Sequence, residues 1–290
     1  MEYKSIQYET NGRIATIRLH RPDVLNAIDF NIPDEIEAAV KVANDDPSVH
    51  VIVVEGSGRA FCAGYDLKLY AENKGPNPGV QEMPWDPMLD FQLMYGNTQK
   101  FMSLWRSYKP TIAKIHGYAV AGGSDIATCC DLIMMAEDAK IGYPPTRVFG
   151  CPSVGMWVYR VGAQTAKRML FTGDLIDGVT AKEYGLAMDA VPADELDQKV
   201  QAMAERMAGI PKNQLMMQKL MINNAIENMG LTSTQQMATL FDGITRHSPE
   251  GLWWKERAED IGFLNAVKER DSGDPIAPDA EKFLPPLPES

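Results

Sequence analysis

The segment from His116 to Asp131, HGYAVAGGSDIATCCD, places a pair of adjacent glycines between a predicted strand and a predicted helix of small residues. Because Gly122 and Gly123 have no Cβ atom, the main chain there can adopt unusual dihedral angles, and a ligand can approach its amides directly. The first amides of a helix have no intrahelical acceptor and carry the positive end of the helix dipole. We therefore expect this turn to hold a developing negative charge, with Asp125 facing the same space.

A second segment also consists of a predicted strand that ends in a glycine-rich turn with exposed amides. Residues 51–67, VIVVEGSGRAFCAGYDL, form an apolar run rich in β-branched residues, followed by a glycine-rich turn and an acidic helix start. One glycine pair before a helix is explained equally well by close packing of the strand against the helix. Two strands that both end on exposed amides instead indicate a site for an anionic group.

Three segments resemble the enoyl-CoA hydratase/isomerase (crotonase) superfamily in order and spacing. They are RPDVLNAI at Arg21–Ile28, GSGRAFCAGYDLK at Gly56–Lys68 and HGYAVAGGSDIATCCDLIMMAEDAKIG at His116–Gly142, and the similarity extends from about residue 3 to about residue 270. The resemblance implies a coenzyme A thioester whose carbonyl oxygen accepts hydrogen bonds from two main-chain amides. Carried over by position, these amides belong to Tyr65, the third residue of AGYD, and to Gly122.

The start of the chain predicts repeated ββα units. Tyr3–Thr10 and Ile14–Leu19 are predicted strands joined by an Asn-Gly pair, which favours the positive φ of a hairpin turn. A helix that starts near Pro33 and a buried strand at Val51–Val54 follow. This order predicts an α/β protein of stacked ββα units rather than a doubly wound sheet. The resemblance implies the same crotonase-like spiral.

We divide the chain into three parts. Residues 1–208 form the predicted ββα spiral core, residues 209–270 a C-terminal helical region, and residues 271–290 a proline-rich tail that we expect to be extended. Apolar residues recur at helical spacing through the second part over wide arcs, which suits a subunit contact as well as a core. The resemblance implies that this helical region mediates a homotrimer or a hexamer.

Charge and cysteine content exclude several classes of function. A net charge of −11 argues against a nucleic-acid surface or an anionic membrane as the main partner. The four cysteines lack the spacing of a zinc site or a disulfide framework, so we expect no metal and no permanently bound cofactor. The resemblance implies that coenzyme A binds only as part of the substrate. The absence of a charged-then-apolar leader and of an apolar run of about 18 residues predicts a soluble cytoplasmic protein.

The proton-transfer positions depart from the family pattern. Hydratases of this family carry one glutamate shortly after the glycine turn and another in the loop after the next strand; here these positions are Asp125 and Pro145. Proline cannot transfer a proton, which leaves three functions open. Asp125 acts as a single general acid or base in a proton shift or a modified hydration; the amide pair supports hydrolysis or C–C bond cleavage; or the protein binds acyl-CoA with little turnover. We favour the first.

The two amides have candidate substrate-binding neighbours, which are Ala63, Asp66, Lys68, Gly123, Tyr143, Pro145 and Arg147. Lys68 follows the AGYD motif and is placed to reach the phosphates or the adenine of coenzyme A. An equally good role for Asp66 is to cap the helix that it precedes. Asn26 is expected to hydrogen-bond its own backbone.

A second proton-transfer group has candidates in two regions. Tyr143, Arg147 and Cys151 lie on the loop around Pro145, and His247, Glu250, Glu256 and Asp260 lie in the last third of the chain. Each is more often a solvated surface residue than a catalyst. The loop at 72–87 and the helix predicted at 88–106 supply candidates for an acyl pocket, namely Trp85, Met88, Phe91, Met94 and Tyr95.

Overall fold

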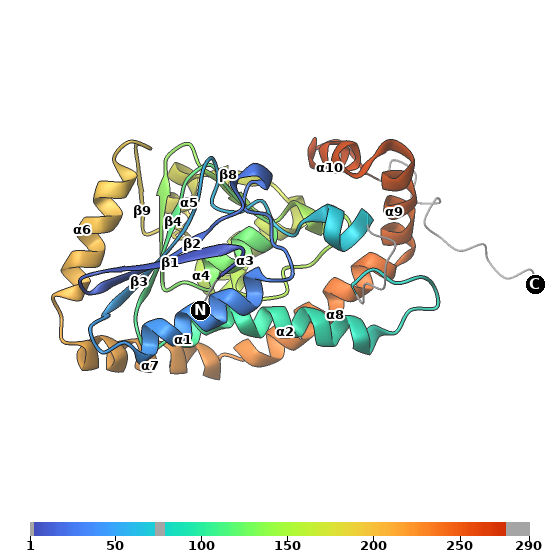
Figure 1. The fold of residues 1–290 in the computed structure, drawn as a ribbon. Helices are drawn as coiled ribbons and strands as arrows, with labels where there is room; N and C mark the ends of the chain where they lie inside the picture. Colours follow the sequence, from blue (N-terminus) through green and yellow to red (C-terminus); the bar gives the residue numbers. More distant parts are fainter. Residues whose placement is uncertain (1–2, 73–78, 277–290) are drawn as a thin grey trace, which may run out of the picture.

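The computed structural model describes residues 3–72 and 79–276, and a six-stranded sheet forms the centre of the fold (Figure 1). Its strands, in spatial order, are β1 (Ile6–Asn11), β2 (Ile14–Leu19), β3 (Val51–Gly56), β4 (Thr111–Ile115), β6 (Leu132–Ala136) and β9 (Asp189–Val191). β1 and β2 pair antiparallel, which confirms the predicted hairpin, and the other neighbours pair parallel. Parallel strands are covered on both faces, and β3 is accordingly buried along its whole length.

A second, three-stranded sheet lies beside the first. Its strands, in spatial order, are β5 (Tyr118–Val120), β7 (Lys140–Gly142) and β8 (Leu175–Asp177). The chain passes from β4 to β5 through Gly117, which has a φ of +60° and where a Cβ atom would lie 2.0 Å from the carbonyl oxygen of Arg59. Only glycine fits this crossing. It brings β5 against the turn after β3, where Cys62 forms a parallel bridge with Ala119.

Helices pack around the large sheet. Those before the C-terminal region are α1 (Ile32–Asp45), α2 (Pro87–Arg106), α3 (Gly122–Thr128), α4 (Trp157–Thr172), α5 (Gly178–Glu183) and α6 (Leu196–Ala208), with short helical turns η1 (Pro22–Val24), η2 (Lys68–Glu72) and η3 (Pro144–Arg147). α6 packs against β2, β3, β4 and β6, whereas α1 packs against β1, β2 and α2 (Figure 1). The helix predicted at 88–106 begins one residue earlier because the Asp86 side chain accepts from the N–H of Met88 (2.9 Å) and caps it.

The last part of the described chain is helical. It comprises α7 (Lys212–Asn228), α8 (Leu231–His247), α9 (Pro249–Ile261) and α10 (Phe263–Asp271). α8 packs along α2 (Figure 1), and α10 contacts α9 and η3. Phe149, Trp254 and Phe263 form a small apolar cluster that holds α9 and α10 in place. The predicted α/β fold class with C-terminal helices is confirmed.

Two predicted irregular segments fall partly outside the described residues. These are residues 73–78 of the predicted loop and residues 277–290 of the predicted extended tail. Within the described ranges, no helix has both the length and the apolar character that crossing a bilayer requires. α7, α8 and the turn between them expose large apolar side chains, among them Met217, Met221, Ile222, Met229, Met237 and Phe241.

Candidate active site

Tyr65 presents its main-chain N–H from the turn after β3. Ile28 and Tyr65 form a parallel bridge, in which the residues on either side of Tyr65 make the hydrogen bonds. Gly64 accepts from the N–H of Ile28 (2.8 Å), and Asp66 donates its N–H to the carbonyl oxygen of Ile28 (3.0 Å). The N–H of Tyr65 itself therefore has no acceptor within the described ranges.

Gly122 presents its N–H from the first position of α3. The preceding residue, Ala121, has a φ of 52° and a ψ of −124°, a conformation that costs a non-glycine residue about 1–3 kcal/mol. It is held there by its N–H, which donates to Gly142 (3.0 Å), and by its carbonyl oxygen, which accepts from Ser124 and Asp125 (2.8 and 3.2 Å). The strained residue turns the chain out of β5, and the Gly122 N–H is left without an acceptor in the part of the chain that the structure describes.

The two turns contact each other. A Cβ atom on Gly64 would lie 3.5 Å from the Gly122 nitrogen, and one on Gly122 would lie 3.0 Å from two ring carbons of Tyr65. On Gly123 it would lie 2.2 Å from the carbonyl oxygen of Cys62, so this position accepts only glycine. The glycines of both motifs thus allow the close approach that brings the two free N–H groups together.

Both amide-bearing residues line one cavity of about 170 Å³. Most of its wall is apolar, with two charged residues from α8 and two from α10. The wall residues that the sequence predicted are Ala63, Tyr65, Met94, Gly122, Tyr143 and Pro145; the others include Leu67, Tyr70, Val80, Phe149, Gly150, Asp242, Arg246, Val267, Arg270 and Asp271. A concave apolar site with few polar groups is typical of small-molecule binding.

Four predicted substrate-binding residues lie outside the cavity wall: Asp66, Lys68, Gly123 and Arg147. The structure corrects the prediction most clearly for Arg147. Its guanidinium group donates to the carbonyl oxygens of Thr172 (3.4 Å) and Asp274, because the η3 turn directs this side chain away from the wall that Pro145 joins.

Asp66 caps the start of η2, as predicted. Its Oδ1 accepts from the N–H of Lys68 (3.1 Å), and its Oδ2 accepts from the guanidinium group of Arg21 (2.9 Å). Asn26 bonds its own loop, as predicted, since its Oδ1 accepts from the N–H of Arg21 (2.8 Å), but its Nδ2 donates to two carbonyl oxygens of the distant turn at 57–60 (both 2.8 Å). The Lys68 side chain is exposed. These contacts fix the turn that carries Tyr65.

Asp125 is buried more deeply than the sequence suggested. It is 1% exposed and is not part of the cavity wall, and its Oδ1 has no hydrogen-bond partner among the described residues. Burial, and then the negative charge of Asp242, raise the pKa of Asp125 well above its usual range. Both causes favour the protonated carboxyl group.

An ion-pair cluster at the cavity wall was missed by sequence reasoning. Arg246 donates to both carboxylate oxygens of Asp90 on α2 (2.7 and 2.8 Å) and also to Asp242, four residues earlier on α8. Its Nε donates to the carbonyl oxygen of Gly79 (2.8 Å). All three charged side chains are almost fully buried. The only signal in the sequence is the i,i+4 spacing of Asp242 and Arg246.

His247 ties the segment before α2 to α8. Its ring stacks on Trp85 with centroids 4.1 Å apart, its Nδ1 lies 2.8 Å from the carbonyl oxygen of Gly243, and its Nε2 accepts from the N–H of Gln81 (3.1 Å). A neutral ring protonated on Nδ1 satisfies both hydrogen bonds. Burial, with a contribution from the Arg246 cation, lowers the pKa of His247. This residue is an anchor for the segment rather than a proton-transfer group.

We expect the stabilising effect of His247 to weaken in acid. A group whose pKa is lowered by folding stabilises the protein above its unfolded-state value of about 6.5 and loses this contribution as the pH falls through the folded-state value. His247→Phe keeps a ring that can stack but removes both hydrogen bonds, so the wild-type protein should be more stable by about 1–3 kcal/mol near pH 8. The difference should be smaller near pH 5, and urea unfolding at both pH values measures it.

Asp90 titrates in the same pH range. Burial raises its pKa to about 6, against the opposing effect of Arg246. A raised carboxyl pKa stabilises the fold at low pH and loses this effect as the pH rises, which is the opposite sign to His247. Because Asp90 is present in both proteins, its contribution cancels in their difference. An equal stability difference at the two pH values would contradict a neutral His247 anchor.

Tyr143 and Cys151, on the loop after β7, were also candidates for a second proton-transfer group. The hydroxyl of Tyr143 donates to the carbonyl oxygen of Cys151 (3.0 Å). Burial raises the pKa of Cys151 to about 12 and so keeps it as a thiol. Neither side chain is a ready proton-transfer group.

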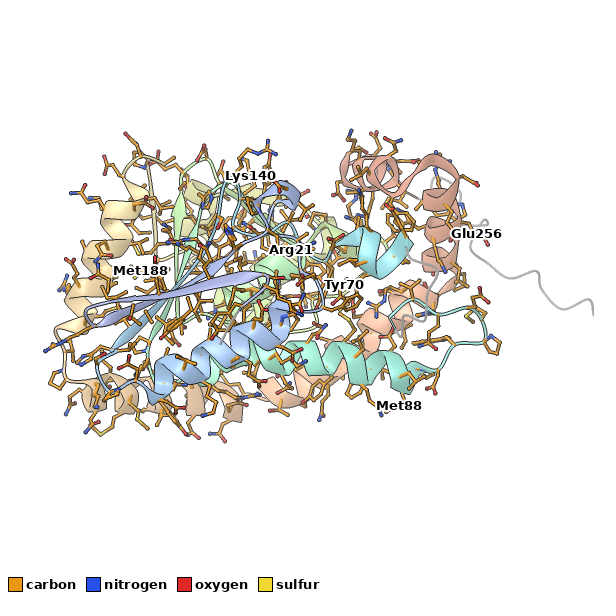
Figure 2. All side chains as sticks on the ribbon, in the orientation of Figure 1. Arg21, Tyr70, Met88, Lys140, Met188 and Glu256 are labelled. Atoms are coloured by element: carbon orange, nitrogen blue, oxygen red, sulfur yellow. The ribbon has the colours of Figure 1, made fainter. Side chains whose placement is uncertain are left out.

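The C-terminal candidates and most of the predicted acyl-pocket residues lie away from the cavity. Glu250, Glu256 and Asp260 are exposed, and Figure 2 shows Glu256 on the outer side of α9. Met88 is 55% exposed and lies at the outer end of α2 (Figure 2). Of the five apolar candidates, only Met94 lines the cavity.

The fold and the cavity together define a class of protein. It is an α/β protein that offers two main-chain N–H groups, without acceptors among the described residues, to a ligand oxygen in an apolar cavity, with a buried carboxyl group next to one of them on α3. Such an arrangement suits a substrate whose carbonyl oxygen gains negative charge during the reaction.

The chain belongs to the enoyl-CoA hydratase/isomerase family, whose sequence model matches residues 9–259. A probable enoyl-CoA hydratase of Mycobacterium bovis is 30% identical over 235 residues, which cover 79% of this chain and 84% of that protein. A crystal structure of an enoyl-CoA hydratase from Mycobacterium smegmatis has 45% identity and a TM-score of 0.87, covering 94% of this chain and 95% of that one. An enoyl-CoA hydratase/isomerase structure from Xanthobacter autotrophicus has 29% identity and a TM-score of 0.84, covering 94% and 100%. The predicted family and crotonase-like fold are confirmed.

Proposed function

We propose that the protein is an acyl-CoA enzyme of the hydratase/isomerase type that stabilises an enolate. The observation that supports this most directly is that the N–H groups of Tyr65 and Gly122 lack acceptors in the described ranges, while both residues line one apolar cavity. A thioester that loses an α-proton, or gains a nucleophile at its β-carbon, places negative charge on its carbonyl oxygen. Two fixed N–H groups in an apolar cavity stabilise that charge without reorganising.

Asp125 is the residue to which we assign the α-proton. It follows Gly122 by three residues on α3, so both lie on one side of that helix. Its Oδ1 has no partner among the described residues, and its raised pKa favours a carboxyl group that carries a proton. Such a group can deliver a proton to the α-carbon of the enolate and remove it in the reverse direction.

Coenzyme A enters in this proposal as part of the substrate, with no resident metal or cofactor. Arg270 lines the cavity from α10, and Lys68 is exposed at the start of η2, so both can meet the phosphates of coenzyme A. The apolar side chains that α7 and α8 expose suit a contact between copies in a homotrimer or hexamer. We place the protein in the cytoplasm.

Pro145 supports two alternative functions. It lines the cavity but offers no proton-transfer group at the position where hydratases of the family carry a glutamate. The same amide pair can stabilise the charge that develops in thioester hydrolysis or C–C bond cleavage. A protein with only the amide pair intact would bind acyl-CoA with little turnover.

Deuterium exchange tests the proposal across many acyl groups at once. A panel of saturated and α,β-unsaturated thioesters, from butyryl-CoA and crotonyl-CoA to longer and aromatic homologues, is incubated with the protein in D2O and followed by NMR. We expect deuterium at the α-carbon of at least one thioester. Release of free coenzyme A alone would favour the hydrolase. Binding of every thioester with no exchange and no product would favour the binding protein.

A further inference from the structure

We propose that Asp242 is a second catalytic carboxylate, which serves the β-carbon of an enoyl thioester from α8 in place of a side chain at position 145. This inference rests on the proposed function and adds a residue to it. Asp242 lines the same cavity as the two free N–H groups and Pro145. Asp271 also lines this cavity, but it lies at the end of α10, where its carboxylate accepts from the Nε of Arg270 (2.7 Å).

Gly150 lies between Pro145 and Asp242, and its distances to both show that the two side chains are close. A Cβ atom on Gly150 would lie 2.7 Å from the Cβ of Pro145 and 3.7 Å from the Oδ1 of Asp242. All three residues line the cavity. The carboxylate of Asp242 therefore lies close to the place from which a longer side chain at 145 would start, and it arrives there from a segment almost one hundred residues later in the chain.

The carboxylate of Asp242 is held in place by two partners. Its Oδ1 accepts from the N–H of Cys151 (2.9 Å), and its Oδ2 accepts from the guanidinium group of Arg246. Arg246 is held in turn by Asp90 on α2. Because Asp242 is only 3% exposed, these partners offset the cost of burying its charge. Each oxygen keeps a lone pair that can accept a proton from water.

Asp125 and Asp242 make an unequal pair. The charge of Asp242 is one of the two causes that raise the pKa of Asp125, so the two carboxyl groups interact through the protein. A proton is favoured on Asp125, whereas Asp242 pairs with the Arg246 cation, so the two carboxyl groups suit the roles of acid and base. Neither role is open to Pro145.

The hydration step balances with these two groups. Water gives its proton to Asp242 and its hydroxyl group to the β-carbon, and the electron pair of the double bond moves to the carbonyl oxygen between the two N–H groups. The enolate then takes the proton of Asp125 at the α-carbon, and the carbonyl re-forms. One water has been added across the double bond, and transfer of a proton from Asp242 to Asp125 restores the starting state.

The test compares hydration with α-proton exchange in matched variants. Asp242→Asn keeps an acceptor for Cys151 but removes the base, so hydration of the best enoyl thioester of the panel should fall by about 100-fold or more. Exchange at the α-carbon of the saturated thioester uses Asp125 and should stay within about threefold of wild type. With the charge at 242 removed, the pKa of Asp125 falls, so the alkaline limb of the residual hydration profile, where Asp125 loses the proton that it must deliver, should move to lower pH.

Asp131→Asn is the matched control. Asp131 also pairs with a buried cation, Lys219 (2.7 Å), but it does not line the cavity. This variant should keep both reactions and the position of the alkaline limb, whatever stability it loses. Equal loss of hydration in both aspartate variants, loss of exchange together with hydration in Asp242→Asn, or a wild-type protein that exchanges α-protons but hydrates no enoyl thioester would each overturn the role of Asp242. A wild-type protein without any exchange would refute the proposed function itself.

Discussion

Replacing Asp125 by asparagine should slow α-proton exchange by about 10²–10⁴-fold, the usual range for loss of a general acid or base. The amide has nearly the same shape as the carboxyl group and cannot transfer its proton. Asp125 is almost fully buried, and burial favours its neutral form, so the change exchanges one uncharged group for another. We therefore expect the variant to fold and to bind a thioester as the wild type does, which NMR exchange and calorimetric titration measure.

The stability of this variant gives an independent check of the protonation state. A carboxyl group whose pKa is raised by folding contributes stability at low pH and loses it as the pH rises through the folded-state value. Asp125→Asn lacks this dependence, so its melting temperature should rise relative to wild type on going to alkaline pH. The same change at the exposed Asp138 is the control and should affect neither exchange nor this trend. Undiminished exchange in Asp125→Asn would assign the α-proton to another residue.

The elements that could be predicted from the sequence are those with a local cause. The hairpin follows from an Asn-Gly turn between alternating strands, and the structure confirms it. The resemblance to the family assigned the two amides to Tyr65 and Gly122, and the glycines visible in the two motifs permit the close approach of their turns. Main-chain groups make this possible because their position depends on backbone geometry and not on the direction of a side chain.

The directions of the side chains were harder to predict from the sequence than the positions of main-chain groups. Arg147 lies two residues after Pro145, yet the η3 turn points it to Thr172 and Asp274. A proline-rich loop restricts the dihedral angles of its own residues, but tertiary contacts decide where its side chains point. The spacing of residues in this loop does not show which of them face the cavity. A candidate chosen by proximity in sequence was therefore placed on the wrong side.

Long-range electrostatic contacts could not be predicted from a single chain. Asp90 and Arg246 are separated by 156 positions and meet because α8 packs along α2. The i,i+4 pair of Asp242 and Arg246 is typical of an exposed helix, where it would contribute only a few tenths of a kcal/mol. Burial increases the energetic effect of this pair, because a charge removed from water needs a partner and shifts the pKa of its neighbours. The pKa of Asp125 reflects that effect.

Replacing the main-chain amide of Tyr65 by an ester should slow enolate formation by about 10²–10³-fold, the usual effect of removing one donor from such a site. Incorporating the α-hydroxy analogue of tyrosine at position 65 substitutes an oxygen for the N–H and keeps the side chain. The N–H of Tyr65 has no acceptor among the described residues, so its removal breaks no hydrogen bond of the fold. The loss should appear in the rate of α-proton exchange, with a smaller change in thioester affinity because the negative charge develops mainly in the transition state.

The same ester at Tyr108 provides the chemical control. The N–H of Tyr108 donates to the side chain of Asn44 (3.2 Å), and its ring is 55% exposed and does not line the cavity. The ester there removes a hydrogen bond that the fold does use, so it should lower the melting temperature slightly while leaving exchange unchanged. The two esters therefore differ in activity: at 65 exchange should fall by the factor given above, with at most a slight loss of stability from the weakened Gly64 carbonyl, whereas at 108 stability should fall slightly and exchange should not change. An ester at 65 that exchanges as fast as the wild type would show that the charge of the enolate is held elsewhere.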